Sequence, residues 1–350
     1  MLRVCDLINY VPNEKEISLK LLVDFYEQYL CRRIFIFTLK NGEVVKLFFK
    51  DASEIYHISG IDHIYDGIPM DGSRFLKEIQ SGKMELETVE KVNAVAYTDY
   101  IDRIRSMFCI DTIIKNCEYL YYSDGKIPES NIKVTYLLLK GLDGKSLHLG
   151  IDTYRKGRPY FTRTLLVTEG NNAMKFVNKA DEKLKVTKLE ICDKDTNEVV
   201  ETVKREEAVV VVRKLVDEIT EKWIQTEFEE NISNFMIQPE VVYKIDVFLK
   251  NKEKNDVDSN IWMQFLQKIV PRTQKNIWIN LWRSRIDEEK VRIRNIVDSL
   301  DPYWSGKIVG EEIRKFEKNE FSKRLQKIVN CYLEDKIKSM KHIVEEQKKL

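Results

Sequence analysis

A histidine inside a strand-like stretch is the residue of this chain best placed for chemistry. His148 lies between Leu147 and Leu149, and the 350 residues include only four histidines. Successive side chains of a strand point to opposite faces. We therefore expect Leu147 and Leu149 to point into the core and His148 to point toward a cleft or solvent. Since imidazole exchanges protons near neutral pH, we expect His148 to serve as an acid or a base.

Hydroxyl and cationic groups follow in the next predicted strand and in the turn before it. Thr162, Arg163 and Thr164 lie in the strand, and Lys156 and Arg158 lie in the turn. Arginine and lysine stabilise the charge of a phosphorane and threonine can donate a hydrogen bond, so the set suits cleavage of a phosphodiester. In a regular strand Arg163 points away from both threonines. A bulge after the turn would change which of the three enters a site.

A second histidine with a recognisable local setting is His57. A capping motif precedes it and starts a short helix that carries this residue, while His63 is expected in the loop that follows. The carboxylates of Glu54 and Asp62 are placed to orient the His57 imidazole. We therefore predict that His57 and His148 form an acid–base pair. The alternative is that His57 is a partly buried helix residue and His148 an exposed strand residue, neither with a catalytic role.

Helices and strands that could position these residues occupy the first 200 residues. The apolar spacing of 18–31 predicts an amphipathic helix, and Asn41-Gly42 predicts a hairpin between two strands. Helices are expected over 73–82 and 86–118, with a break near Thr98-Asp99. The predicted strands cover 33–39, 44–49, 119–123, 132–139, 146–152, 161–168 and, as the last one, 185–192. Residues 1–200 therefore predict an α+β domain with N-terminal helices packed on an antiparallel sheet.

The pattern changes near residue 200. From Lys204 onward helical periodicity dominates, so residues 201–350 predict a mainly α-helical accessory domain. All five tryptophans lie in this half, and we expect Trp278 and Trp282, which share a helix face, to pack in a core. Residues 271–350 hold 19 Lys and Arg against 13 Asp and Glu. This excess fits either an acidic partner or a solvated helix face.

Composition and missing motifs argue against several other classes of protein. Hydrophobic residues make up 43% and charged residues 33%. No stretch approaches the roughly 20 apolar residues of a membrane span, and the start carries no signal peptide. The six cysteines form no C-x-x-C pair, which argues against a structural zinc site and suits a reducing cytoplasm. Phosphate-binding glycine loops, dinucleotide fingerprints and H-E-x-x-H do not occur in the sequence. We therefore expect no metal, no cofactor and no membrane contact.

Five segments of the first half carry a family resemblance. They are Leu21 to Leu30, Phe35 to Glu43, Tyr56 to Ile61, Leu147 to Ile151 and Tyr160 to Val167. Together they resemble the phage-associated nuclease-like domains of the barnase, EndoU, colicin and RelE-like superfamily, subtype four, over roughly residues 17–192. The histidine on the helix of that family is usually followed by Leu-Leu-Gly, where this chain has Ile58-Ser59-Gly60.

The resemblance implies a curved antiparallel sheet covered by an N-terminal helical segment. It also implies metal-independent endoribonuclease chemistry, often in toxin-like settings or in conflicts between phages and mobile elements. RNA, with transfer RNA among the candidates, is then the expected substrate. The expected catalytic residues are His57, His148, Arg163 and Thr164, with Lys156 and Arg158 binding the substrate. The helical half inherits no function and is a candidate surface for a protein partner or inhibitor.

Two other interpretations stay open. The first is a catalytically degenerate module that binds RNA or protein without cutting, and the second is a structural or regulatory protein of a phage or mobile element. Fold alone does not decide between these functions. The geometry of the two histidines does decide. If His57 and His148 lie in one cleft with an arginine nearby, cleavage is favoured, and if they lie on opposite faces, binding without cleavage is favoured.

Overall fold

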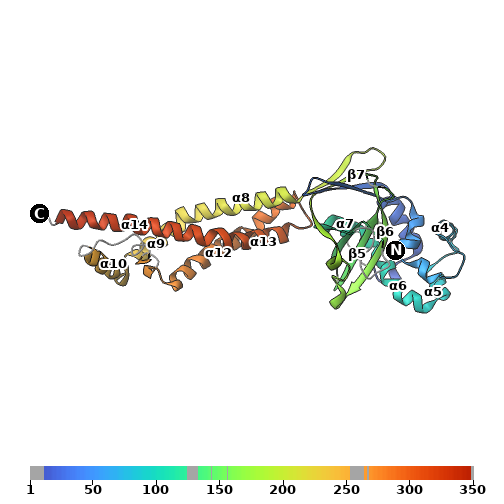
Figure 1. Ribbon diagram of the computed structural model, residues 1–350, viewed down its shortest axis with the longest axis horizontal. Helices are drawn as coiled ribbons and strands as arrows, with labels where there is room; N and C mark the ends of the chain where they lie inside the picture. The colour runs from blue at the N-terminus through green and yellow to red at the C-terminus, as the bar shows by residue number, and fades with distance from the viewer. Residues whose placement is uncertain are drawn as a thin grey trace. The chain divides into compact units, whose positions relative to one another are not determined.

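The computed structural model of this chain describes residues 12–123, 133–142, 144–155, 157–252, 264–265 and 268–347. The chain divides into two compact units between Glu206 and Glu207. The first combines a sheet with helices, and the described part of the second is helical (Figure 1). The fold is therefore α+β with a helical C-terminal region, as the sequence predicts. Of the helices in the described ranges, none has both the length and the apolar composition needed to cross a membrane.

One sheet that closes on itself forms the framework of the first unit. Its order is β1-β2-β6-β5-β4-β3-β7, with β7 pairing back to β1 and β8 extending the sheet beside β7. Among the described strands, all neighbouring pairs are antiparallel except β2 and β6, which are parallel. The strands are β1 (Arg33–Leu39), β2 (Val44–Phe48), β3 (Tyr119–Tyr122), β4 (Tyr136–Leu142), β5 (Lys145–Asp152), β6 (Tyr160–Glu169), β7 (Glu182–Asp193) and β8 (Val199–Lys204).

Strands β1 and β2 follow the period of two that the sequence predicts. Phe35 and Phe37 of β1 pair with Leu47 and Val45 of β2, and all four side chains are buried while their neighbours along each strand are more exposed. The hairpin turn between them contains Gly42, whose φ of +87° lies in the left-handed region that glycine adopts without a steric penalty. Local alternation and turn chemistry are therefore sufficient to build this hairpin.

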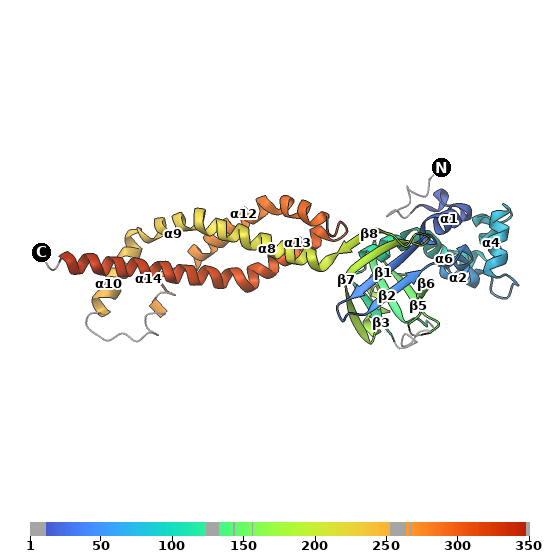
Figure 2. The same ribbon diagram turned by 90° about the horizontal axis from the view of Figure 1, so that it is seen from above.

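Helices of the first unit, α1, α2, α4 and α6, gather on one side of its sheet (Figures 1 and 2). The hydroxyl of Ser18 caps the first of them by accepting a hydrogen bond from Leu21 N at 3.1 Å. Helices α2 and α6 contact β6, whereas α7 contacts β4 and β5. The helices are α1 (Leu19–Phe25), α2 (Ile55–Ile58), α3 (Ile61–Ile64), α4 (Gly72–Gln80), α5 (Leu86–Val92), α6 (Ala94–Ser106) and α7 (Ile110–Asn116), with the π-helical turn η3 (Tyr26–Leu30) after α1 and the 3-10 turn η4 (Ala52–Glu54) before α2.

Two expectations about these elements are wrong. The strand predicted over 185–192 is not the last, because β8 follows it and pairs with β7. Helix α6 is not interrupted at Thr98-Asp99, since the Thr98 hydroxyl donates to the Ala94 carbonyl at 3.0 Å within the helix. The preceding interruption lies at Asn93, whose side chain accepts from Ala96 N at 3.1 Å and caps α6.

The core of the second unit is rich in aromatic side chains. Trp223, Trp278 and Trp282 are fully buried, which confirms core packing for the last two, and Trp282 Nε1 donates to the Thr220 hydroxyl at 3.0 Å. Helices α8 and α14 lie side by side in both views (Figures 1 and 2). The helices are α8 (Arg205–Trp223), α9 (Glu229–Met236), α10 (Pro239–Lys252), α12 (Arg272–Asp298), α13 (Ser305–Phe316) and α14 (Ser322–Gln347).

Ion pairs neutralise much of the basic cluster on α12. The pairs are Arg283 with Glu317, Arg285 with Glu288 at 3.0 Å, Lys290 with Asp287 at 2.5 Å and Arg292 with Glu289 at 3.4 Å. Since these four cations of α12 each have a nearby carboxylate, this surface is less attractive to a polyanion than the excess of Lys and Arg in the sequence indicates.

Candidate active site

A cavity of about 590 Å³ in the first unit is lined by several charged, imidazole and hydroxyl side chains. Residues of η4, α2, α3, α6 and β6 line it, together with residues from the adjoining loops. Its ionisable lining consists of Lys50, Arg103, Lys133, Arg163, Glu54, Asp62, His57 and His63. Four cations against two carboxylates make the cavity suitable for an anionic ligand. Of the residues predicted as catalytic, His57, Arg163 and Thr164 line it together.

The carboxylate of Asp62 holds the imidazole of His57. Helices α2 and α3 follow each other across a sharp turn at Gly60, so Asp62 reaches back to His57, with Nδ1 and Oδ2 3.0 Å apart. This hydrogen bond raises the pKa of His57 above its ordinary value of 6.5, against the opposing effects of burial and of the Arg163 charge. Because Nδ1 is occupied, Nε2 is the atom that can exchange a proton with a ligand, and the side chain is 62% exposed.

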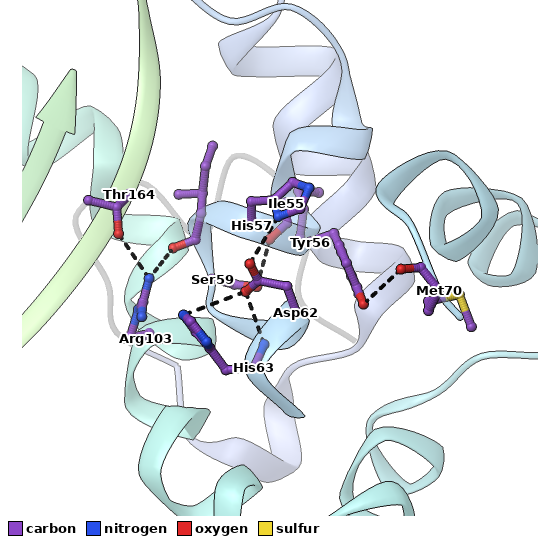
Figure 3. Close-up of polar contacts among 10 residues, drawn as sticks. Ile55, Tyr56, His57, Ser59, Asp62, His63, Met70, Arg103 and Thr164 are labelled. Carbon is purple, nitrogen blue, oxygen red and sulfur yellow. Dashed lines mark hydrogen bonds and ion pairs between the residues drawn. The ribbon is translucent and has the colours of Figure 1, made fainter. Parts of the chain in front are cut away.

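A second imidazole flanks the same carboxylate. Nε2 of His63 lies 4.0 Å from the other Asp62 oxygen, and the His63 ring stacks on Tyr100 at 5.1 Å. Burial tends to raise the pKa of Asp62, but the His57 hydrogen bond and the nearby positive groups lower it overall. Asp62 is therefore ionised at neutral pH and fixes one orientation of His57. Figure 3 shows its carboxylate between the His57 and His63 side chains. Within the described ranges, no group of three or more His, Cys, Asp or Glu side chains is arranged to hold a metal ion.

Arg103 of α6 connects the helix that carries His57 to strand β6. Its Nη2 donates to the carbonyl of Ile58 and to the hydroxyl of Thr164, both at 3.0 Å (Figure 3). Because the Thr164 oxygen accepts this bond, its own proton is left to donate to a ligand. Burial lowers the pKa of the Arg103 guanidinium from its usual 12.5, although arginine remains charged at neutral pH.

Strand β6 contains the bulge that brings its three polar residues into one cavity. Thr162 pairs with Ile151 and Thr164 pairs with Gly150, which leaves Arg163 as the additional residue on β6. A bulge breaks the alternation of side chains, and all three of these β6 residues line the cavity. The positive charge of Arg163 also lowers the pKa of His57, which reflects how near the two groups are.

A second carboxylate of the cavity has the opposite protonation tendency to Asp62. Glu54 Oε2 accepts from the Tyr26 hydroxyl at 2.8 Å and from Lys50 N at 3.1 Å. Burial raises the pKa of Glu54 above its ordinary value of 4.5, although these hydrogen bonds oppose the shift. The cavity therefore holds a carboxylate and an imidazole whose pKa values are both raised, a pair of groups of the kind that general acid–base chemistry uses.

His148 does not line this cavity, and the expectation that it faces a cleft or solvent is wrong. Its side chain is fully buried, with Nε2 3.0 Å from the Thr168 hydroxyl and the edge-on ring of Phe176 at 5.3 Å. Burial lowers the pKa of His148 to about 4, so it is neutral at pH 7. The reason is that β5 is covered on both faces: all residues from Leu147 to Ile151 are buried.

Arg158, one of the two cations predicted in the β5–β6 turn, is not among the described residues that line the cavity. Arg158 is exposed, and its backbone N–H donates to the Arg155 carbonyl at 3.1 Å. Lys156 lies outside the described residues. Arg103 and two lysines, Lys50 and Lys133, line the cavity instead. No sequence motif marks these three residues. For Arg103 the reason is that its hydrogen-bond partner, Thr164, lies 61 positions away in the sequence.

Comparison with known proteins places the chain in a family. The family model described as phage-Barnase-EndoU-ColicinE5/D-RelE like nuclease 4 matches residues 19–230, well over half of the chain. The match extends past residue 192, where the sequence resemblance was expected to end, and includes β8 and α8. Neither the curated proteins nor the solved structures include a match to this chain. On the extent of the family match, the chain belongs to the fourth group of phage nuclease-like proteins related to barnase, EndoU, colicins E5 and D, and RelE.

Proposed function

We propose that this chain is an endoribonuclease that cleaves RNA without a metal ion, by attack of a ribose 2′-hydroxyl on the adjacent phosphate. The observation that carries the proposal is the His57 imidazole, held at Nδ1 by Asp62 in a cavity with an excess of cations. The nucleophile, the ribose 2′-hydroxyl, is part of the RNA itself. The protein therefore has to supply a base, an acid and positive charge around the phosphate.

Proton transfer is assigned to Glu54 and His57. The Glu54 carboxylate takes the proton of the 2′-hydroxyl, and the 2′-oxygen forms a bond to phosphorus. Protonated His57 donates from Nε2 to the 5′-oxygen as its bond to phosphorus breaks, leaving a 2′,3′-cyclic phosphate and a 5′-hydroxyl. The raised pKa of His57 keeps the acid protonated close to neutral pH, and the raised pKa of Glu54 makes it a stronger base than an exposed carboxylate.

Charge stabilisation is assigned to the residues around the β6 bulge. Arg163 and Arg103 offset the negative charge of the phosphorane, and the free proton of the Thr164 hydroxyl donates to a phosphate oxygen. Lys50 and Lys133 attract the backbone of the RNA. Asp62 acts through His57 and is a positioning residue. His148 has no part in this mechanism, since its buried imidazole does not line the cavity.

The test is cleavage of labelled transfer RNA and of a synthetic single-stranded RNA by the purified full chain in EDTA. A matched oligonucleotide with a 2′-deoxyribose at the cleaved position should stay intact, and the products should carry cyclic phosphates. His57→Ala should lower the rate by about 10²- to 10⁴-fold, the usual contribution of general acid–base catalysis. Arg163→Ala should also lower it, whereas Arg158→Ala, a neighbouring arginine outside the cavity lining, should not.

Three outcomes would contradict the proposal. Cleavage of the 2′-deoxy oligonucleotide would exclude attack by the 2′-hydroxyl. Activity that is lost in EDTA and restored by a divalent cation would exclude a metal-free mechanism. Binding of RNA without cleavage would favour the degenerate RNA-binding module that the sequence leaves open.

A further inference from the structure

An exposed aromatic stack lies at the rim of the same cavity. The ring of Tyr154 lies over that of Phe161 with centroids 4.5 Å apart and an interplanar angle of 22°. Phe161 is 8% exposed, whereas Tyr154 is 85% exposed, and both line the cavity that contains His57. One face of the tyrosine ring is therefore covered by Phe161. The other is left to solvent, as a flat apolar surface facing outward.

Hydrogen bonds fix the short segment that presents Tyr154. The Thr153 hydroxyl lies within donating distance of three carbonyls of the turn, those of Arg155 at 2.9 Å, Arg158 at 3.3 Å and Pro159 at 3.4 Å. On the other side, Asp152 Oδ1 accepts from Thr153 N at 2.9 Å and from the Thr135 hydroxyl at 2.8 Å. A flat ligand would thus meet a ring whose backbone is fixed by these hydrogen bonds and whose other face is packed on Phe161, which lowers the entropy that binding costs.

The spacing along β6 relates this stack to the charged part of the cavity. Phe161 precedes Arg163 by two positions, which corresponds to at most roughly 7 Å along a strand, since the bulge at Arg163 shortens the rise. One nucleotide spans about that length between its base and the neighbouring phosphate, so a base on Tyr154 leaves a phosphate within reach of the cations. Aromatic side chains in single-strand binding sites stack on bases in this way, largely independently of sequence.

We propose that the Tyr154–Phe161 stack binds the base of an unpaired nucleotide next to the scissile phosphate, so that this protein acts on single-stranded RNA or on loops rather than on duplexes. The ligand class follows from the surface: a planar, uncharged ring system attached to an anion. Bases inside a duplex are already stacked and paired and cannot lie on a side chain. The position of the base beside the cut rests on the proposed function, whereas base binding itself does not.

Binding is measured with the full chain carrying His57→Ala, so that cleavage of the probe is slowed by about 10²- to 10⁴-fold. The probe is a short RNA with one 2-aminopurine, either single-stranded or annealed to its complement. Tyr154→Ala should weaken binding of the single strand by about 5- to 150-fold, since base–aromatic stacking contributes roughly 1–3 kcal/mol per base. It should also abolish the fluorescence quenching that stacking causes. Tyr154→Phe keeps the ring and should bind like the parent.

Tyr243 offers a matched control, because it is 68% exposed and lies on α10 of the second unit. Tyr243→Ala should leave binding unchanged. The inference is overturned if Tyr154→Ala binds the single strand as tightly as its parent, or if the duplex binds as tightly as the single strand. If the stack binds RNA but the unmutated chain does not cut it, the proposed function fails and this inference stands. If RNA is cut but neither binding nor cleavage depends on Tyr154, the proposed function stands and this inference fails.

Discussion

Replacing Gly60 by alanine should disturb the site through two separable effects. Gly60 has a φ of +81°, so any residue with a Cβ is strained there, by about 1–2 kcal/mol for alanine. A Cβ at this position would also lie 2.4 Å from Tyr100 Cδ1 and 2.8 Å from Arg103 Nη1. Since Cδ1 is close to the base of the ring, Tyr100 has to change its rotamer and lose its stack on His63. Overpacking of this kind costs about 1–3 kcal/mol, which brings the expected total loss of stability to about 2–5 kcal/mol.

Gly67 isolates the second effect. Its φ is +77°, but a Cβ added there would have no atom within 4 Å. Gly67→Ala should therefore cost only the backbone strain, about 1–2 kcal/mol. The reduced entropy of the unfolded chain, which every Gly→Ala change brings, is the same in both variants and cancels in the comparison. The difference between them, about 1–3 kcal/mol, measures the contact of Gly60 with Tyr100 and Arg103.

Urea unfolding followed by far-UV circular dichroism gives the two free energies. All five tryptophans lie in the second unit, so their fluorescence reports that unit separately and should not change in either variant. Under conditions where both variants are folded, Gly60→Ala should also lower RNA cleavage by roughly tenfold or more, because displacement of Arg103 loosens its bonds to Ile58 and Thr164. Equal destabilisation by Gly60→Ala and Gly67→Ala would refute the steric reasoning, and full activity of Gly60→Ala would refute the role given to Arg103.

Three further predictions concern charge and protonation. If protonated His57 is the acid, cleavage falls as pH rises through its pKa. Asp62→Asn replaces the carboxylate that raises this pKa by a neutral amide and should move the basic limb of the pH–rate profile to lower pH. Arg163→Ala removes a positive charge that lowers this pKa and should move the limb to higher pH. Limbs that stay in place would exclude His57 as the titrating acid. The pKa of His148 is about 4 in the folded protein, below the ordinary value of about 6.5. As pH falls from 6.5 to 4, His148 therefore becomes protonated in the unfolded chain but stays neutral in the folded protein. The free energy of unfolding should drop by about 3 kcal/mol over that interval. His148→Leu should reduce this acid sensitivity in urea titrations at several pH values, and an unchanged pH dependence would contradict the burial argument. Replacing Lys50 and Lys133 together by alanine should make the slope of log affinity for RNA against log salt concentration shallower, by about 0.7 per lysine. An equal change of slope from Arg285→Ala combined with Arg292→Ala would instead place the RNA on α12.

Local features of this protein follow from the sequence because their determinants lie within a few residues of one another. Ser18 caps α1 through an amide three positions later, and Asn41-Gly42 turns β1 into β2. The approach of Asp62 to His57 belongs to the same class, since two short helices with a glycine between them suffice to bring the side chains together. The family resemblance also depends on short segments of this kind, although the family match continues to residue 230.

Contacts between distant segments were decided only by the tertiary structure. Alternation around His148 indicates that this residue lies on a different face of β5 from its leucine neighbours, but Phe176, almost thirty residues later in the chain, covers that face and buries the imidazole. Arg103 enters the site because α6 packs on β6, and its sequence neighbours show nothing of that contact. Closure of the sheet through β1 and β7 is likewise a pairing of strands far apart in the chain. Hydrophobic patterning specifies which residues seek burial, whereas the segment that covers them depends on the packing of the whole unit.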